Sequence, residues 1–168
     1  LILAYSLTKR FTSFSHIFLG LALSLAPTGA YISVSGKFDL VPVIYSLVVL
    51  CWVSGFDIIY SLQDTEFDLD NELFSIPAKL GIKQALILSG FLHSLAVVFV
   101  ISSGLISGAG LLYWAGMILF TALLVWEHLI LSPDDRGSIT KAFGTINSYA
   151  GLLFCAFAIA DLYIPLTL

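Results

Sequence analysis

Acidic side chains are concentrated in one short stretch at the end of a long apolar run. The stretch reads Gly55-Phe56-Asp57-Ile58-Ile59-Tyr60-Ser61-Leu62-Gln63-Asp64-Thr65-Glu66-Phe67-Asp68. At about 100° per residue, a continuous helix would place three of its carboxylates and one phenol within a sector of about 80°. We call these four residues the acidic stripe; they are Asp57, Tyr60, Asp64 and Asp68.

Three carboxylates on one helix face repel one another, so a positive charge is expected between them. A protein cation would serve, but a divalent metal suits the pattern better. Magnesium favours oxygen ligands and is typically held by one or two carboxylates together with phosphate oxygens of a substrate. No combination of histidine and cysteine suggests zinc or iron instead. The stripe therefore predicts a magnesium and diphosphate site, with a solvated interfacial loop as the alternative interpretation.

The composition of the chain indicates whether the protein is surrounded by water or by lipid. Of 168 residues, 59% are hydrophobic and 11% are charged, and the mean hydropathy is +1.02. A water-soluble domain carries roughly a quarter charged residues, so this chain cannot form an ordinary polar surface. The uncharged runs are too long and too unbroken for barrel strands. We therefore predict an all-α fold, a polytopic bundle of transmembrane helices.

Uncharged runs of membrane length locate the helices, because about 20 apolar residues are needed to cross the hydrocarbon region. Three runs are clear, at 11–36, 40–56 and 142–160. A longer run, 84–126, contains the glycine-rich turn signal 108–110 and is interpreted as two helices joined by a hairpin. This gives five full spans, and 1–7 is interpreted as the end of a sixth.

The first residues read as a helix already in progress, and the chain begins with Leu1. We expect the N-terminal part of a larger membrane protein to be missing. Residues 1–168 are then a single transmembrane domain, the C-terminal portion of a larger bundle.

Alternation of five spans assigns the basic residues to the two membrane faces. Six of the seven lie on one face, and only Lys37 lies on the other. By the positive-inside tendency, the face with six is cytoplasmic, and it also carries the acidic stripe. We expect a multi-pass protein of the cell (inner) membrane with its aspartate-rich face in the cytoplasm. The six residues are Lys9, Arg10, Lys79, Lys83, Arg136 and Lys141.

The acidic stretch resembles the second aspartate-rich motif of the UbiA-type membrane prenyltransferases, of which the 4-hydroxybenzoate polyprenyltransferases are members. The matching pattern is Gly55-Phe56-Asp57-x-x-Tyr60-x-x-x-Asp64-x-x-x-Asp68, followed by Ser75-Ile76-Pro77 and Leu80-Gly81-x-Lys83. Upstream, Tyr5-x-x-x-Lys9 is similar to another element of the family, and Gly20 and Pro27-x-Gly29 lie where members commonly have them. The resemblance spans nearly the whole chain.

The resemblance implies a bundle of nine helices around a central cavity, with two aspartate-rich motifs at its cytoplasmic mouth. The first motif is not found among these 168 residues, and we expect activity to need the part that carries it. The implied partners are a polyprenyl diphosphate, an aromatic acceptor and membrane lipid, and no nucleic acid is expected.

The implied reaction is ionisation of an allylic diphosphate and attack by an electron-rich aromatic ring. Asp64 and Asp68 would hold Mg²⁺, and Asp57 would bind the metal or orient its water shell. Lys9 would contact the diphosphate, and Tyr5 would bond to it or flank the allylic cation. Tyr60 is the aromatic residue best placed to stabilise that cation.

Several alternatives remain open. Within the family, the acceptor is 4-hydroxybenzoate by default, with menaquinone-, heme O- or chlorophyll-type acceptors as alternatives. From other classes, an ion-coupled transporter or a noncatalytic scaffold would also be an apolar helix bundle. A transporter is expected to place acidic groups along a path through the membrane rather than at one end.

Polar residues inside the expected spans have a structural or a proton-transfer interpretation. Asn147 with Gly151 suits close packing and an interhelical hydrogen bond. Asp161 is expected to lie at the membrane interface. A role as proton relay remains the alternative to a structural role for three histidines and one glutamate, which are His16, His93, Glu127 and His128.

Overall fold

A computed structural model of the chain describes residues 5–133 and 135–164. Its elements are α1 (Tyr5–Thr8), α2 (Ser15–Ser35), α3 (Leu40–Tyr60), the 3₁₀ turn η1 (Ser61–Asp64), α4 (Thr65–Asp70), α5 (Ile76–Leu80), α6 (Ile82–Ser107), α7 (Leu111–Ile130), α8 (Arg136–Thr140), the π-helix η2 (Lys141–Ile146) and α9 (Asn147–Tyr163). The described residues are helical throughout apart from short connections, which confirms the all-α prediction.

Within the described residues, five helical segments are long and apolar enough to cross a membrane, as the sequence predicted. Two of them join consecutive elements, α3 with η1 and α4, and α8 with η2 and α9. The long uncharged run divides at Gly108, which ends α6 with a left-handed φ of 65°. Glycine adopts this conformation without strain, so it is a common helix terminator. The expected end of a sixth span lies mostly outside the described residues, because only its last part falls in α1.

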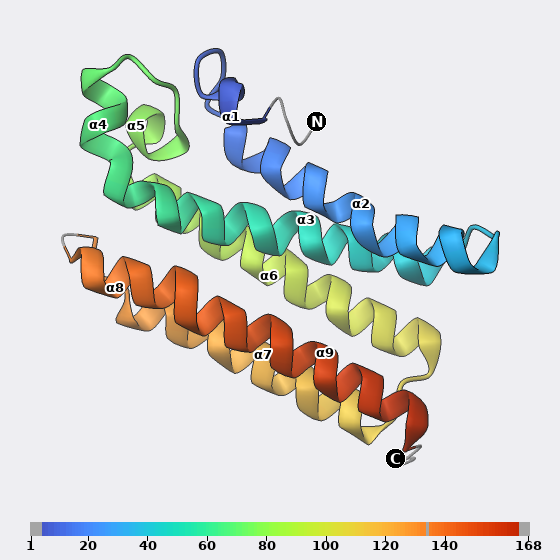
Figure 1. The fold of residues 1–168 in the computed structure, drawn as a ribbon. Coiled ribbons are helices and arrows are strands. Elements are labelled where there is room, and N and C mark those ends of the chain that lie inside the picture. The colour runs from blue at the N-terminus through green and yellow to red at the C-terminus, as the bar shows by residue number, and fades with distance from the viewer. Residues whose placement is uncertain (1–4, 134, 165–168) are drawn as a thin grey trace.

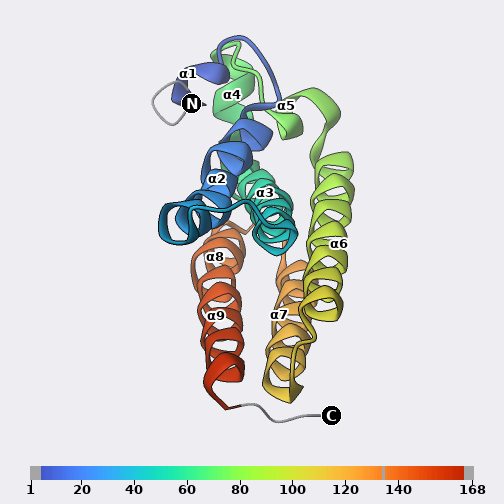
Figure 2. The same cartoon turned by 90° about the vertical axis from the view of Figure 1, so that its right-hand side faces the viewer.

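The long helices run back and forth along one axis and form two groups (Figure 1). Helix α3 packs against α2 and α6, whereas α7 pairs with α9. Viewed along the bundle, α3 lies between α2 and α6, and α7 and α9 lie below these three helices (Figure 2). The short elements α1, α4, α5 and α8 gather at one end, which we call the acidic end because it carries the acidic stripe.

Small residues allow the helices to approach closely. A Cβ atom at Gly20 would collide with the backbone carbonyl of Leu50, so this glycine sets the approach of α2 to α3. At the interface of α7 and α9, Gly116 leaves room for the Cβ atom of Phe157. Lipid provides little hydrophobic drive between helices, so such close packing is a main source of association.

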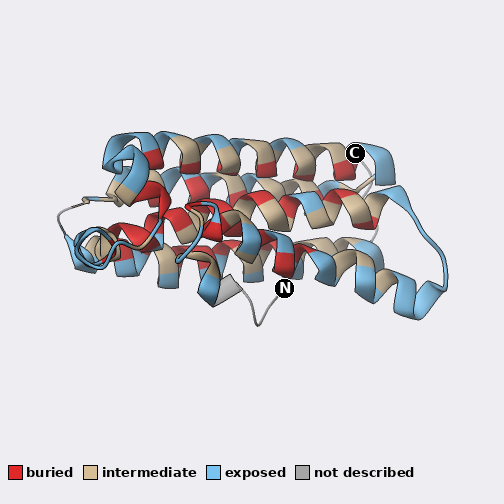
Figure 3. Ribbon diagram, turned by 90° about the horizontal axis from the view of Figure 1, so that it is seen from above, coloured by how far each residue is buried: buried red, intermediate tan, exposed pale blue. Residues whose placement is uncertain are grey.

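The long helices alternate between buried and exposed positions (Figure 3), and large hydrophobic residues occupy many of the exposed ones. Large hydrophobic residues with outward-facing side chains include Val34 and Leu129, which are 90% and 77% exposed. A soluble protein would not expose so much apolar area, but this surface suits contact with lipid. The burial pattern therefore agrees with a multi-pass membrane protein.

Asp161, near the end of α9, caps the first turn of α7. Its two carboxylate oxygens accept hydrogen bonds from the backbone N–H groups of Gly110 (2.7 Å) and Tyr113 (3.2 Å). Asp161 thus lies near the end of a span and also links α9 to the start of α7 by hydrogen bonds. The negative carboxylate at this position also interacts favourably with the positive N-terminal end of the α7 helix dipole.

Replacing Asp161 by alanine is expected to lower the free energy of unfolding by about 1 kcal/mol, the usual loss for a helix cap. Asp161→Asn, which keeps one acceptor oxygen, is expected to lose less. Thermal unfolding in detergent measures both changes. Equal stability of Asp161→Ala and the wild-type protein would contradict this role.

Candidate site at the acidic end

The chain changes helix type within the acidic stripe. Helix α3 ends at Tyr60, the 3₁₀ turn η1 follows, and α4 leaves in a new direction (Figure 1). A 3₁₀ turn advances each residue by about 120° rather than 100°, so the stripe does not lie on one continuous helical face. In the turn, the Thr65 hydroxyl donates to the carbonyl of Leu62 (2.9 Å), a bond that competes with regular helix geometry.

Asp57 is held by a histidine from the preceding span. The Nδ1 atom of His16 lies 2.7 Å from Oδ2 of Asp57, and Nε2 accepts the backbone N–H of Ile76 at 3.5 Å. Because Nε2 accepts, the neutral ring carries its proton on Nδ1 and donates it to the carboxylate. His16 is buried, whereas the Asp57 side chain is 20% exposed. The pair fixes the orientation of Asp57 and engages one of its oxygens.

Asp68 is paired with Lys9. The Lys9 Nζ atom lies 3.1 Å and 3.3 Å from the two carboxylate oxygens, and the Asp68 side chain is 1% exposed. The backbone N–H of Phe74 donates to the carbonyl of Lys9 at 2.7 Å, so the loop after α4 is tied to the same segment. In this structure a protein cation balances Asp68, the arrangement that the sequence offered as the alternative to a metal.

The other stripe residues lie nearer the surface. Asp64 is half-buried at the end of η1, and Tyr60 is 40% exposed. The Tyr60 ring packs on Phe143 of η2 with 4.3 Å between ring centroids, and Phe143 meets the edge of Phe56 at 5.5 Å. Phe56 in turn contacts Trp52 at 5.6 Å. We call these four side chains the aromatic row; it leads from the acidic end into the bundle.

The predicted magnesium ligands are not assembled into a metal site. Within the described residues, no three His, Cys, Asp or Glu side chains come together in a group that could hold a metal ion. The donor chemistry still fits magnesium, since one or two carboxylates are enough when a diphosphate supplies further oxygens. Asp64 and the second oxygen of Asp57 are the available donors, and Asp68 would have to exchange Lys9 for the metal. The magnesium site stays a prediction.

Tyr5, the remaining candidate, lies in α1, but its side chain falls outside the described residues. No local sequence pattern indicates the role of Phe143, which is 83 positions from Tyr60 in the chain. Nor does such a pattern identify His16 as the partner of Asp57, 41 positions away. Both are contacts between helices whose packing cannot be read from local periodicity.

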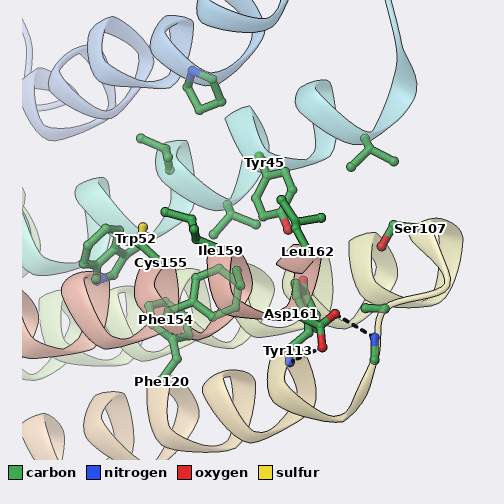
Figure 4. A pocket seen from close by; sticks show the side chains of 18 of the residues that line it. Tyr45, Trp52, Ser107, Tyr113, Phe120, Phe154, Cys155, Ile159, Asp161 and Leu162 are labelled. Atoms are coloured by element: carbon green, nitrogen blue, oxygen red, sulfur yellow. Dashed lines mark hydrogen bonds between the residues drawn. The ribbon is translucent and has the colours of Figure 1, made fainter. Parts of the chain in front are cut away.

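A cavity of about 690 Å³ lies beyond the aromatic row, between α3, α7 and α9 (Figure 4). Its walls are mostly apolar and aromatic, and Trp52 lies on the wall that continues the row. The cavity reaches the α6–α7 hairpin, where Asp161 caps α7. Further lining residues include Tyr45, Val48, Tyr113, Phe154 and Ile159.

Comparisons with known proteins agree with these features. A sequence model of the UbiA prenyltransferase family matches residues 1–159. The chain is 27% identical over 158 residues to a 4-hydroxybenzoate octaprenyltransferase of Pseudoalteromonas translucida, covering 89% of this chain and 51% of that protein. It is 29% identical over 168 residues to the enzyme of the same name from Shewanella sediminis, covering 95% and 55%.

A solved structure shares the fold. The apo structure of a UbiA homolog from Aeropyrum pernix K1 superposes with a TM-score of 0.82 at 30% identity, covering 95% of this chain and 60% of that one. The chain spans about half the length of the curated relatives it matches.

Proposed function

Because this chain belongs to the UbiA prenyltransferase family, we propose that its protein transfers a polyprenyl group from an allylic diphosphate to an aromatic acceptor. The family match over residues 1–159 carries this proposal. The contact of Lys9 with Asp68 supports it, because two separate family motifs meet there. The relatives named 4-hydroxybenzoate octaprenyltransferase favour 4-hydroxybenzoate as acceptor and a role in quinone biosynthesis.

We also propose that the acidic end faces the cytoplasm across the cell membrane. Six of the seven basic residues belong to segments at this end, and only Lys37 lies at the other. The charged diphosphate head of the donor would then meet the protein where its charged residues gather. The isoprenoid tail, which is insoluble in water, would follow the aromatic row into the apolar cavity.

In this mechanism, the residues of the acidic end act on the diphosphate head. Lys9 would donate hydrogen bonds to diphosphate oxygens as negative charge develops on the leaving group. Asp57, Asp64 and Asp68 would hold Mg²⁺, which supplies Lewis-acid stabilisation of that charge. The π faces of Tyr60 and Phe143 would flank the allylic carbon and stabilise positive charge there. The apolar walls would keep water away from the cation.

The test is an assay of the protein expressed from its complete gene, in membranes, with a prenyl diphosphate, a panel of aromatic acids and Mg²⁺. We expect a prenylated acid as product and loss of product when a chelator removes divalent metal. Asp64→Asn is expected to lower kcat/KM about 100-fold or more, because a ligand of the charge-stabilising metal is lost.

Glu66→Gln is the matched control, since Glu66 is an exposed acid two residues away. It removes the same charge from the same short segment without touching the stripe. Product formation that is unaffected by the chelator and by Asp64→Asn would overturn the magnesium assignment. Absence of any prenylated acid would overturn the proposed reaction.

A further inference from the structure

A chain of polar side chains crosses the otherwise apolar bundle next to the cavity. Trp52 of α3 donates its indole Nε1–H to Oδ1 of Asn147 at 2.8 Å. The Asn147 amide donates to Oε1 of Glu127 at 2.8 Å and to the carbonyl of Ala142 at 3.1 Å. Glu127 is fully buried. The chain of bonds thus joins α3, α9 and α7 inside the membrane-spanning region.

Histidines from α6 and α7 complete this network. His93 Nε2 lies 3.3 Å from the carbonyl of Trp52, and because a carbonyl only accepts, Nε2 carries the proton. In the neutral ring Nδ1 is then an acceptor, and it lies 3.1 Å from Nε2 of His128, which donates. Oε2 of Glu127 has no hydrogen-bond partner and lies 3.9 Å from His93 Nδ1. Both the backbone and the side chain of Trp52 are therefore fixed by this network.

Packing restricts the Trp52 ring further. A Cβ atom at Gly151 would collide with the ring, so only glycine leaves the space that the indole occupies. The edges of Phe56 and Phe120 meet the ring with centroid distances of 5.6 Å and 5.7 Å. Asn147 itself follows directly after the π-helix η2, a helix type that is rare and frequent at functional sites.

Trp52 lies where the aromatic row meets the apolar cavity. By helical rise it is about 12 Å from Tyr60 along α3. If the allylic carbon lies at Tyr60, as the proposed function requires, the first isoprene units of the donor span the distance to Trp52. Only the later units of a long donor must then pass the Trp52 ring. The orientation of this ring then matters for long donors and little for short ones.

We propose that Asn147 and Glu127 are positioning residues that hold the Trp52 indole and so determine how tightly long polyprenyl donors bind. This inference rests on the proposed function. Polar groups inside a membrane are costly and are retained when they have a role. Here the role needs only an acceptor oxygen at Glu127 and both amide functions at Asn147, and it needs no proton transfer to substrate.

The first experiment needs no turnover. Trp114→Phe and Trp126→Phe, with any tryptophan elsewhere in the gene product also replaced, leave Trp52 as the only tryptophan, whose emission is selected by excitation at a wavelength that tyrosine does not absorb. Asn147→Leu and Glu127→Leu are expected to shift its emission to shorter wavelength and lower its anisotropy, because the first removes the acceptor of the indole N–H and the second removes the acceptor that holds the Asn147 amide. Glu127→Gln keeps the acceptor oxygen and is expected to preserve both signals. Unchanged signals in Asn147→Leu would overturn the positioning role.

The second experiment compares geranyl with octaprenyl diphosphate as donor in membranes. Asn147→Leu and Glu127→Leu are expected to raise KM for octaprenyl diphosphate about tenfold and KM for geranyl diphosphate less than twofold. Trp52→Phe, which keeps a ring but lacks the N–H, is expected to show the same selectivity if the leucine variants do not fold. Ser148→Ala, on the same helix but outside the network, is the control.

Two kinetic outcomes would overturn the inference. Equal losses with both donors would indicate general destabilisation. Loss of kcat in Glu127→Gln with both donors would indicate proton chemistry at Glu127. If the wild-type protein transfers neither donor, the proposed function fails, and the Trp52 emission still decides whether the network holds the ring.

Discussion

Asp68→Asn is expected to lower kcat/KM for prenyl transfer about 100-fold to 1000-fold, the loss typical for a group that stabilises transition-state charge. Asp68 is 1% exposed and binds the Lys9 ammonium with both oxygens. The substitution removes the charge that positions Lys9 and one of the predicted magnesium ligands. Radiolabelled product from membranes of equal protein content measures the loss.

A double-mutant cycle separates these two effects. If Lys9 and Asp68 act only as a pair, then Lys9→Met combined with Asp68→Asn loses no more activity than either single variant. If Lys9 binds the diphosphate and Asp68 binds the metal, the two losses multiply. Asp70→Asn, at an exposed acid in the same helix, is the control. Wild-type rates in Asp68→Asn would remove this residue from the site.

His16→Leu is expected to lower kcat/KM about 10-fold to 100-fold, the usual range for a residue that orients a metal ligand. The Nδ1–H of His16 fixes Asp57 at 2.7 Å from a fully buried position. The leucine variant lacks this N–H donor, so the Asp57 carboxylate loses its hydrogen-bond partner. His16→Asn is expected to retain most of the activity, because its amide N–H occupies nearly the place of Nδ1–H.

If Asp57 holds Mg²⁺ as proposed, the Mg²⁺ concentration needed for activity distinguishes this role from simple destabilisation. We expect His16→Leu to need several-fold more Mg²⁺ for half-maximal activity, and His16→Asn to stay near the wild-type value. Titration of Mg²⁺ in the membrane assay measures both. Equal losses in the two variants at an unchanged Mg²⁺ requirement would show that His16 serves stability alone.

The positions of the membrane spans could be predicted from the sequence, because the length of an uncharged run is a local property of the chain. Each of the three shorter uncharged runs contains one long helix, and the longest run contains two, which are divided at Gly108. The interhelical bond expected of Asn147 and the close packing expected of Gly151 are also confirmed, since small and amide residues within spans have few other uses. The indole of Trp52 as their shared partner was not predictable, because it lies 95 positions from Asn147.

The geometry of the candidate site was less accessible to sequence reasoning. The acidic stripe assumed a continuous helix, whereas the hydroxyl groups of Ser61 and Thr65 bond to backbone carbonyls where the 3₁₀ turn forms. The partners of Asp57 and Asp68 come from residues 41 and 59 positions away. Periodicity describes a single helix, so it cannot choose such partners between helices.

The π-helix η2 determines how the chain would respond to the loss of a residue near Asn147. A π-helix contains more residues per turn than an α-helix, so Lys141–Ile146 holds a surplus relative to regular geometry. In a π-helix each residue turns by less than the roughly 100° of an α-helix, so the surplus residue widens one turn and the flanking helical segments keep nearly the same faces. Loss of one residue there would leave an unbroken α-helix that still spans the membrane, with α8 and α9 in nearly their present orientation. The irregularity is therefore confined to the turn that carries Phe143, directly before Asn147.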